Sequence, residues 1–421
     1  MSTVTTAYFP ELEDIQKAAS TIHEVAMVTP LMNSIRYSKR YQANILLKRE
    51  DLQRVRSYKI RGAFNKISSL SEEELKRGVV CASAGNHAQG VAFACNHLGI
   101  RGTIYMPSVT PSQKVAQTKM FGGEHVDIIL EGDTFDDSSK AAMKACELEG
   151  KTFVHPFEDP KTIEGQGTIG LEIFKQSDVV IDYVFVAIGG GGLASGLCGA
   201  MKALSPKTKI IGVEPKGAPS MLTSIRNNKN TEIFDIDKFI DGAAVQKVGD
   251  LNFEICKEHL SDMYTVPEGL VCQTILDLYN RDAIVVEPAG ALTLAALEFY
   301  KDKIKGKNVV CIISGSNNDI TRTAEIKERA LLYADLKHYF IVRFPQRAGA
   351  LKQFVGEVLG PNDDITHFEY SKKSSRENGP AVVGIELKDK NDLEPLITRM
   401  KKLNFFGDYL NDKPDLFQFL V

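Results

Sequence analysis

Four short stretches of the sequence carry residues that could hold or activate a small anionic molecule. The first is SYKIRGAFN, residues 57–65, in which Lys59 stands at the start of a predicted helix. A helix N-terminus disfavours additional positive charge, so the amine of Lys59 loses its proton more easily there, as a Schiff-base former must. A lysine by itself is more often a solvated surface residue, so this interpretation depends on the other stretches.

Two further stretches place polar residues directly after buried strands. In CASAGNHAQG, residues 81–90, backbone N–H groups converge at the start of an apolar helix, which suits a carboxylate, although Ser and Asn also favour an ordinary N-cap. In VVCIISGSNND, residues 309–319, the strand ends at Ser314. This position is at the rim of a ligand site, although serine is also common in turns.

The fourth stretch, residues 184–200, contains the glycine run Gly189 to Gly192 between an apolar strand and a predicted helix. Such a turn offers N–H donors to a phosphate, and glycine lets the backbone approach closely. A packing turn without a ligand seldom needs four glycines. The apolar run 183–201 is nearly long enough to span a bilayer, but its glycines would leave backbone groups unsatisfied in lipid, so we reject a membrane span.

A dinucleotide site is a third interpretation of the same turn. Gly189, Gly191 and Ala194 match the spacing G-x-G-x-x-A, and Glu214 ends the next predicted strand, where an acidic residue would bind a ribose. A single match of this kind is weak.

The elements that must position these stretches alternate between strand and helix from Ala43 to about Ile320. The clearest strands are 78–83, 101–107, 125–130, 181–189, 209–215 and 307–315, and the clearest helices are 86–99, 111–123, 133–150 and 193–204. This alternation predicts an α/β fold with parallel sheets covered on both faces. Ligands in such folds bind at the carboxyl ends of the strands.

A different pattern begins at His338. The predicted order is strand 338–344, helix 349–359, strand 365–371, polar turn 372–379, strand 381–387, helix 392–403 and a last short strand near Asp408. This βαββαβ order is typical of ferredoxin-like domains. We therefore expect a domain boundary near Asp335.

The composition favours small-molecule chemistry. The chain of 421 residues is long enough for several domains, and its net charge of −3 argues against nucleic-acid or anionic-membrane binding. The N-terminus lacks the pattern of a signal peptide, which predicts a cytoplasmic protein. Scattered cysteines without metal-ligand spacing predict reduced thiols and no metal site: Cys81, Cys95, Cys146, Cys198, Cys256, Cys272 and Cys311.

Taken together, the motifs resemble one enzyme family. SYKIRGA, SAGNHAQG, EGQGTIGLEI, GGGGL, DGAAV, EPAGA and SGSNND are similar, in order, to motifs of the pyridoxal-phosphate-dependent serine/threonine dehydratases of fold type II. The last motif departs from the family pattern, since Ser316 replaces the usual glycine or alanine. The resemblance implies a catalytic domain over 1–335 with two doubly wound subdomains, the smaller inserted at roughly 60–160, and an ACT-like regulatory domain over 336–421.

The resemblance also implies residue roles. Lys59 would be the catalytic residue and bind the cofactor as a Schiff base, Asn86 would contact the ring 3-oxygen, and Ser314 would face the ring nitrogen. The cofactor phosphate would be held by Gly189, Gly190, Gly191, Gly192 and Leu193. The substrate carboxylate would be held by Ser83, Gly85 and His87. A serine at the ring nitrogen, where an aspartate would keep the ring protonated, favours β-elimination over transamination.

The activity implied is deamination of L-threonine to 2-oxobutanoate and ammonia, the first step of isoleucine biosynthesis. The same resemblance implies feedback inhibition by isoleucine, relief of that inhibition by valine, and a homotetramer. Alternatives remain: a serine dehydratase or racemase of the same fold, a nicotinamide oxidoreductase, which would leave Lys59 unused, and an amino-acid-sensing scaffold without catalysis.

Overall fold

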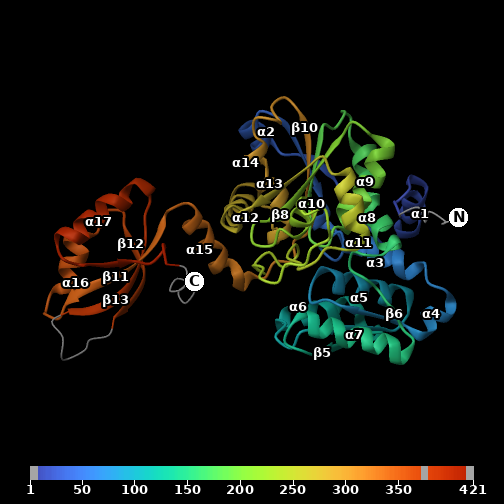
Figure 1. Ribbon diagram of the computed structural model, residues 1–421, viewed down its shortest axis with the longest axis horizontal. Coiled ribbons are helices and arrows are strands. Elements are labelled where there is room, and N and C mark those ends of the chain that lie inside the picture. The colour runs from blue at the N-terminus through green and yellow to red at the C-terminus, as the bar shows by residue number, and fades with distance from the viewer. Residues whose placement is uncertain (1–7, 371–377, 414–421) are drawn as a thin grey trace. The chain divides into compact units, whose positions relative to one another are not determined.

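The computed structural model describes residues 8–370 and 378–413 of the chain. These residues form two compact units, 1–319 and 320–421 (Figure 1). Helix α15, Thr323–Tyr333, belongs by its contacts to the second unit. These contacts do not test the predicted boundary near Asp335 or the predicted inserted subdomain, so both stay predictions.

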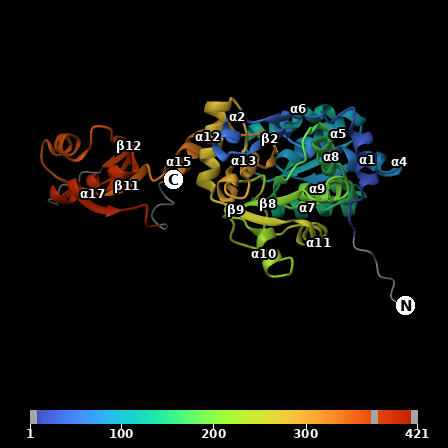
Figure 2. The ribbon, with the colours of Figure 1, turned by 90° about the horizontal axis from the view of Figure 1, so that it is seen from above.

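A six-stranded sheet forms the centre of the first unit. Its strand order is β1-β2-β10-β7-β8-β9, and all neighbours are parallel except β1 and β2. The strands are β1 Leu31–Asn33, β2 Asn44–Arg49, β7 Tyr183–Ala187, β8 Lys209–Pro215, β9 Asp262–Val266 and β10 Asn308–Ile313. In both views α12 and α13 lie on one side of β8 and α8 and α9 on the other (Figures 1 and 2). Helices therefore cover both faces, as the apolar strands require.

A second, four-stranded parallel sheet has the order β5-β4-β3-β6. Its strands are β3 Val79–Ala82, β4 Gly102–Met106, β5 Val126–Leu130 and β6 Thr152–Phe153. Buried apolar residues of α3 and α5 pack against β3 and β4 in one continuous core. The predicted α/β class with parallel sheets is confirmed.

Two helices of the first unit begin at clear capping signals in the sequence. Thr134 and Asp137 form a capping box at α7, and Asp159 caps α8 with Pro160 in its first turn. The helices are α1 Leu12–Ile22, α2 Ile35–Tyr41, α3 Lys59–Ser68, α4 Glu72–Arg77, α5 Asn86–Leu98, α6 Ser112–Gly122, α7 Phe135–Glu149, α8 Pro160–Gln176, α9 Gly192–Leu204, α10 Ser220–Arg226, α11 Asp250–His259, α12 Glu268–Asp282, α13 Pro288–Ala295 and α14 Leu297–Tyr300, with short 3-10 turns Glu50–Leu52 and Gly123–His125. A further 3-10 turn, Ile320–Arg322, precedes α15 in the second unit.

Glycines in α8 let this helix pack closely between two others. A Cβ on Gly165 would lie 2.7 Å from the carbonyl oxygen of Arg61 in α3. A Cβ on Gly167 would lie 2.8 Å from the carbonyl oxygen of Gly196 in α9. Only glycine permits these backbone contacts, so the EGQGTIGLEI motif fixes how near α3 and α9 come to α8.

The second unit contains an antiparallel sheet of order β12-β13-β11-β14. Its elements are β11 Lys337–Pro345, α16 Ala350–Gln353, a π-helical turn Phe354–Val358, β12 Asp364–Tyr370, β13 Asn378–Glu386, a 3-10 turn Lys390–Asp392, α17 Leu393–Lys402 and β14 Phe406–Tyr409. The predicted βαββαβ order is confirmed, but the predicted helix 349–359 divides into an α-helical and a π-helical turn. The predicted turn 372–379 lies largely outside the described residues.

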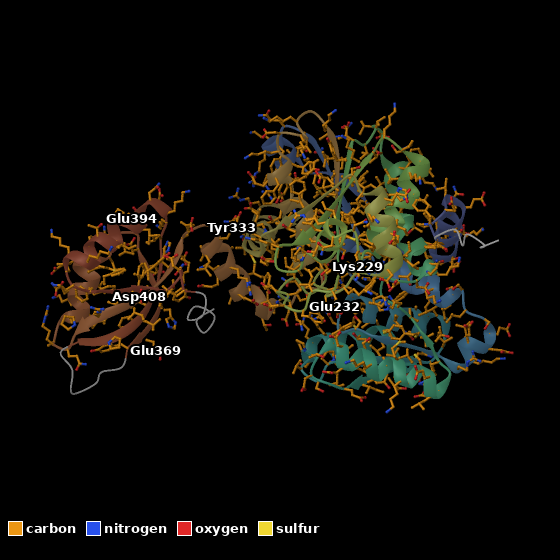
Figure 3. The ribbon with its side chains drawn as sticks, viewed as in Figure 1. Lys229, Glu232, Tyr333, Glu369, Glu394 and Asp408 are labelled. Carbon is orange, nitrogen blue, oxygen red and sulfur yellow. The ribbon has the colours of Figure 1, made fainter. Side chains whose placement is uncertain are left out.

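Within this second unit, apolar side chains of β11, β13 and α17 form the core. Figure 3 labels Glu369 of β12 and Glu394 of α17, both exposed. Among the described residues of the whole chain, none of the helices combines the length and apolar character needed to cross a membrane.

Candidate active site

The structure brings the four predicted stretches together in the first unit. The N–H of Tyr58 donates to the carbonyl of Ser314 at 3.2 Å, which joins the first stretch to the last. The Asn317 amide donates to the Asn86 side-chain oxygen at 2.6 Å, which joins the last stretch to the second. Phe157, one residue after the partner of Lys59, packs on the glycine turn.

Lys59 is the first residue of α3, as predicted. Its amine donates to the carbonyl oxygen of Pro156 at 2.8 Å. Burial lowers the pKa of this amine to about 8, and the partly opposing charge of Glu287 does not restore the ordinary value. At pH 7 roughly a tenth of Lys59 is therefore unprotonated, far more than at an ordinary lysine, and this is the form that attacks a carbonyl carbon.

The glycine turn between β7 and α9 has no room for side chains. A Cβ on Gly190 would lie 2.2 Å from ring atoms of Phe157, and one on Gly192 would lie 2.9 Å from the Phe157 carbonyl oxygen. Gly191 has φ +95° and would place a Cβ 2.7 Å from Asn252. Packing alone therefore explains three of these glycines, contrary to our expectation that a packing turn would not need them.

The same turn has the donors that a phosphate requires. Among the described residues, no protein acceptor is recorded for the N–H groups of residues 189–193, which end at the N-terminus of the 13-residue helix α9. Asn252 holds the turn open by donating to the carbonyl of Gly190 at 2.8 Å and to that of Phe157 at 3.1 Å. Unpaired N–H groups and the helix dipole together suit a dianion, so the turn fits a cofactor phosphate.

Asn86 opens α5 and is held by a buried carboxyl group. Its amide donates to Glu287 at 2.7 Å. Burial and, to a smaller extent, the charge of Asp241 raise the pKa of Glu287 to about 7, although the hydrogen bond from Asn86 opposes both effects. With Asn317 on its other side, the Asn86 side chain has one fixed orientation.

Ser314 and the residues predicted to bind the substrate carboxylate differ in their surroundings. Ser314 follows β10 and is 3% exposed. Ser83 accepts from the N–H of Gly85 at 3.2 Å, and no atom lies within 4 Å of the position of a Cβ on Gly85, so open space adjoins this backbone. The imidazole of His87 is buried, with Nε2 2.8 Å from the Val154 carbonyl.

Two histidines near Lys59 are neutral. Burial lowers the pKa of His87 to about 3 and that of His155 to about 4, and the charge of Lys59 adds to both shifts. Because Nε2 of His87 faces a carbonyl, it carries the proton, and Nδ1 is an acceptor. His87 can therefore serve a carboxylate through its main-chain N–H, while its ring stays inside the protein.

Glu214, the acidic residue that a dinucleotide site would use, makes hydrogen bonds to another part of the chain. Glu214 is 1% exposed and accepts from the N–H groups of Met221 and Leu222 at 2.7 and 2.9 Å. Burial raises the pKa of Glu214 to about 8, while these hydrogen bonds lower it. The carboxyl group holds the start of α10, so it does not face a ribose site.

Several residues of this site were missed from the sequence. Pro156 and Phe157 lie in a loop without periodic pattern, and Asn252 opens no recognisable motif. Glu287 belongs to the quoted EPAGA motif but received no role. The sequence feature that could have identified Glu287 is a single carboxylate between two apolar segments.

Two family profiles match the chain. The one described as pyridoxal-phosphate dependent enzyme covers residues 23–315, and the one described as the C-terminal regulatory domain of threonine dehydratase covers residues 328–420.

Curated and solved proteins agree with these matches. The chain is 55% identical over 411 residues to the L-threonine dehydratase biosynthetic IlvA of Halalkalibacterium halodurans, covering 98% of this chain and 99% of that protein. Threonine deaminase isoform 2 from Solanum lycopersicum superposes with a TM-score of 0.72 at 40% identity, covering 77% of this chain and 90% of that one. Maize serine racemase superposes with a TM-score of 0.71 at 30% identity, covering 77% and 99%.

Proposed function

The chain belongs to the pyridoxal-phosphate-dependent enzymes and carries the regulatory domain of threonine dehydratases, and we propose from this that it deaminates L-threonine to 2-oxobutanoate and ammonia in isoleucine biosynthesis. The observation that carries the proposal is the identity to a biosynthetic threonine dehydratase over nearly the whole length of both chains. The lowered pKa of the Lys59 amine and the N–H groups of the glycine turn, without a recorded protein acceptor in the described part of the chain, support it.

The residues at this site have the chemistry to hold pyridoxal phosphate. Lys59 supplies the amine for covalent attachment, residues 189–193 supply N–H donors to the phosphate, and Asn86 and Ser314 supply polar groups to the ring. When bound, the cofactor withdraws electrons from the α-carbon of the amino acid, which makes its proton removable.

Lys59 then acts as the general base. Once the amino group of threonine has displaced it from the cofactor, the Lys59 amine would take the proton from the α-carbon. As the ammonium it would return a proton to the β-hydroxyl, which leaves as water when the electron pair forms the new carbon–carbon double bond. The released aminocrotonate hydrolyses to 2-oxobutanoate and ammonia, so atoms and charges balance. The lowered pKa of Lys59 keeps the basic form available, and the Pro156 carbonyl orients the amine.

Ser314 is suited to elimination. A serine hydroxyl is neutral, so it does not hold a proton on the ring nitrogen as a carboxylate would, and the electron pair is expelled through the β-carbon. Asn86, fixed between Glu287 and Asn317, cannot rotate away from the ring. The main chain of residues 83–87 would bind the substrate carboxylate beside the open space at Gly85.

The second unit is the regulatory domain of this enzyme, and we assign isoleucine as its inhibitor, with valine as the opposing effector. The support is its βαββαβ order and its match to the threonine dehydratase regulatory family. A homotetramer in the cytoplasm completes the proposal. None of the seven cysteines, all of which lie in the described part of the chain, forms a disulfide, which is compatible with that reducing compartment.

The competing activity is that of a serine dehydratase or racemase, because a serine racemase shares this fold at 30% identity. Oxo-acid formation and chiral analysis with L-threonine and with L-serine separate the two. We expect faster 2-oxobutanoate formation from threonine and no D-serine. Lys59→Ala should abolish turnover, and a Lys59→Ala protein with substantial turnover would contradict the proposal.

A further inference from the structure

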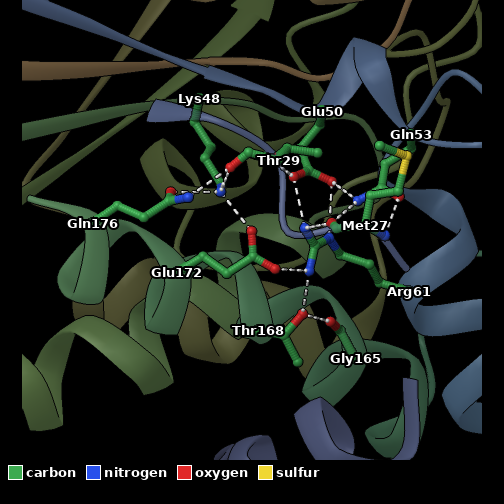
Figure 4. Close-up of polar contacts among 10 residues, drawn as sticks. All are labelled: Met27, Thr29, Lys48, Glu50, Gln53, Arg61, Gly165, Thr168, Glu172 and Gln176. Carbon is green, nitrogen blue, oxygen red and sulfur yellow. Dashed lines mark hydrogen bonds and ion pairs between the residues drawn. The ribbon is translucent and has the colours of Figure 1, made fainter. Parts of the chain in front are cut away.

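A buried network of charged side chains connects helix α3 to its neighbouring elements. We name it the α3 ion network, and it consists of Lys48, Glu50, Arg61 and Glu172 (Figure 4). The Arg61 guanidinium donates two hydrogen bonds of 2.8 Å to Glu50 and one of 2.6 Å to Glu172. The Lys48 amine donates to Glu172 at 2.5 Å and to the Thr29 carbonyl at 2.6 Å.

All four charges are withdrawn from water. The side chains of Lys48 and Glu50 are 0% exposed, that of Arg61 is 1% and that of Glu172 is 14%. Burial would raise the pKa of Glu50, but Arg61 and Lys48 hold it below the ordinary value. Two cations therefore face two carboxylates. An apolar cluster would fill such a space with equal or better stability, so a role in stability alone is a weak explanation for the network.

The network joins the elements that carry the site. Arg61 follows Lys59 by two positions on α3, and Glu172 lies on α8, the helix that follows the Pro156 loop. Lys48 lies on β2 in register with Ile312 of β10, the strand that precedes Ser314. Helix α3 thus contributes Arg61 directly, while Glu172 and Lys48 lie on elements next to the Pro156 loop and next to β10.

The network adds to other contacts between α3 and α8, since Asn65 donates to the Lys161 carbonyl at 2.7 Å and Lys66 pairs with Asp159 at 2.7 Å. A Cβ on Gly62 would lie 2.7 Å from the Thr162 carbonyl oxygen, as close as the contact already described at Gly165. The side chain of Gln166 also packs on Gly62, so the two helices are in close contact along this face. A guanidinium fork on a carboxylate fixes both distance and orientation.

We propose that Lys48, Glu50, Arg61 and Glu172 are positioning residues that fix α3 against α8 and β2, and thereby place the amine of Lys59 at the Pro156 carbonyl. This inference rests on the proposed role of Lys59. The network touches neither substrate nor cofactor and acts through the position of the helix.

The test compares Arg61→Lys with Arg36→Lys in the full-length protein. Arg36 also makes a forked ion pair, with Asp282, but joins α2 to α12 away from α3. Kinetics of the holoenzyme are combined with the pH dependence of Lys59 acetylation in the apoprotein, followed by peptide mass spectrometry, and with thermal unfolding. The apoprotein readout reports on the amine itself, independent of turnover.

We expect Arg61→Lys to lower kcat at least about tenfold with KM nearly unchanged, since small misplacements of a reacting group have large effects on rate. It should also shift the titration of Lys59, whereas Arg36→Lys should change neither. If Arg61→Lys does not fold, Glu172→Gln, at the rim of the network, replaces it in the same measurements with the same expected effects. Wild-type kcat and Lys59 titration in the folded variant would overturn the inference, as would effects no larger than those of Arg36→Lys.

The same experiment separates this inference from the proposed function. A wild-type protein that neither binds pyridoxal phosphate at Lys59 nor turns over threonine would refute the function. If the wild type is active and the network variants match it in kcat and in the titration of Lys59, only the positioning role is refuted.

Discussion

Gly190→Ala is predicted to damage the packing of the glycine turn before it affects any ligand. The new Cβ would lie 2.2 Å from the Phe157 ring, whereas nonbonded carbons prefer roughly 3.5–4.0 Å. The ring must therefore move by more than about 1 Å, and overpacking of this kind costs typically about 1–3 kcal/mol. We expect the midpoint of thermal unfolding of the apoprotein to fall by a few degrees, on the order set by this cost.

Gly85→Ala is the matched control, since no atom lies within 4 Å of its added Cβ. This variant should unfold like the wild type while raising KM for threonine, because the methyl group enters the open space beside the predicted carboxylate site. In the holoenzyme, Gly190→Ala should in addition release pyridoxal phosphate faster on dialysis.

A double-mutant cycle identifies the cause. Phe157→Ala removes the ring that the new methyl group strikes, so Phe157→Ala and Gly190→Ala together should be less destabilising than the sum of the two by at least about 1 kcal/mol. Chemical unfolding of the apoprotein measures this coupling. Additive effects, or a Gly190→Ala protein as stable as Gly85→Ala, would refute the packing explanation.

Two further predictions concern a buried carboxyl group and the second unit. The pKa of Glu287 is raised from 4.5 in the unfolded chain to about 7, so the native state binds the extra proton and stability falls as pH rises between these values. Glu287→Gln should remove that fall, so above pH 7 its free energy of unfolding should exceed that of the wild type by as much as about 3 kcal/mol. Unfolding measured across pH checks this, and parallel pH profiles of the two proteins would contradict it. A chain ending at Asp335 should retain turnover but lose the increase in threonine requirement caused by isoleucine in steady-state kinetics. Inhibition that persists in the shortened chain would refute the assignment of the effector site to residues 336–421.

The elements of the fold could be predicted because their signals are local. Each β-branched run, such as 209–215, became a strand, and Lys59 and Asn86 open helices where the preceding residues indicated. The helix predicted over 349–359 was wrong in detail, because the pattern of apolar residues does not distinguish an α-helical from a π-helical turn.

The site could be predicted only where its residues lie in recognisable strand-to-helix turns. The contacts that give it shape join distant parts of the chain, as Asn86 with Glu287 and Phe157 with Gly190 do. No local pattern reports such contacts. A recognisable motif also does not fix where a side chain points. His87 lies in the predicted motif, but its imidazole is directed to the Val154 carbonyl instead of the open space.

The most direct test of the central claim is to trap the cofactor on its lysine. The purified protein, loaded with pyridoxal phosphate, is reduced with borohydride, digested and mapped by mass spectrometry. The cofactor mass should be found on the peptide carrying Lys59 and should be lost when threonine is present in excess before reduction. A protein that acquires no cofactor mass, or carries it on another lysine, would contradict the assignment of Lys59 and with it the proposed threonine deamination.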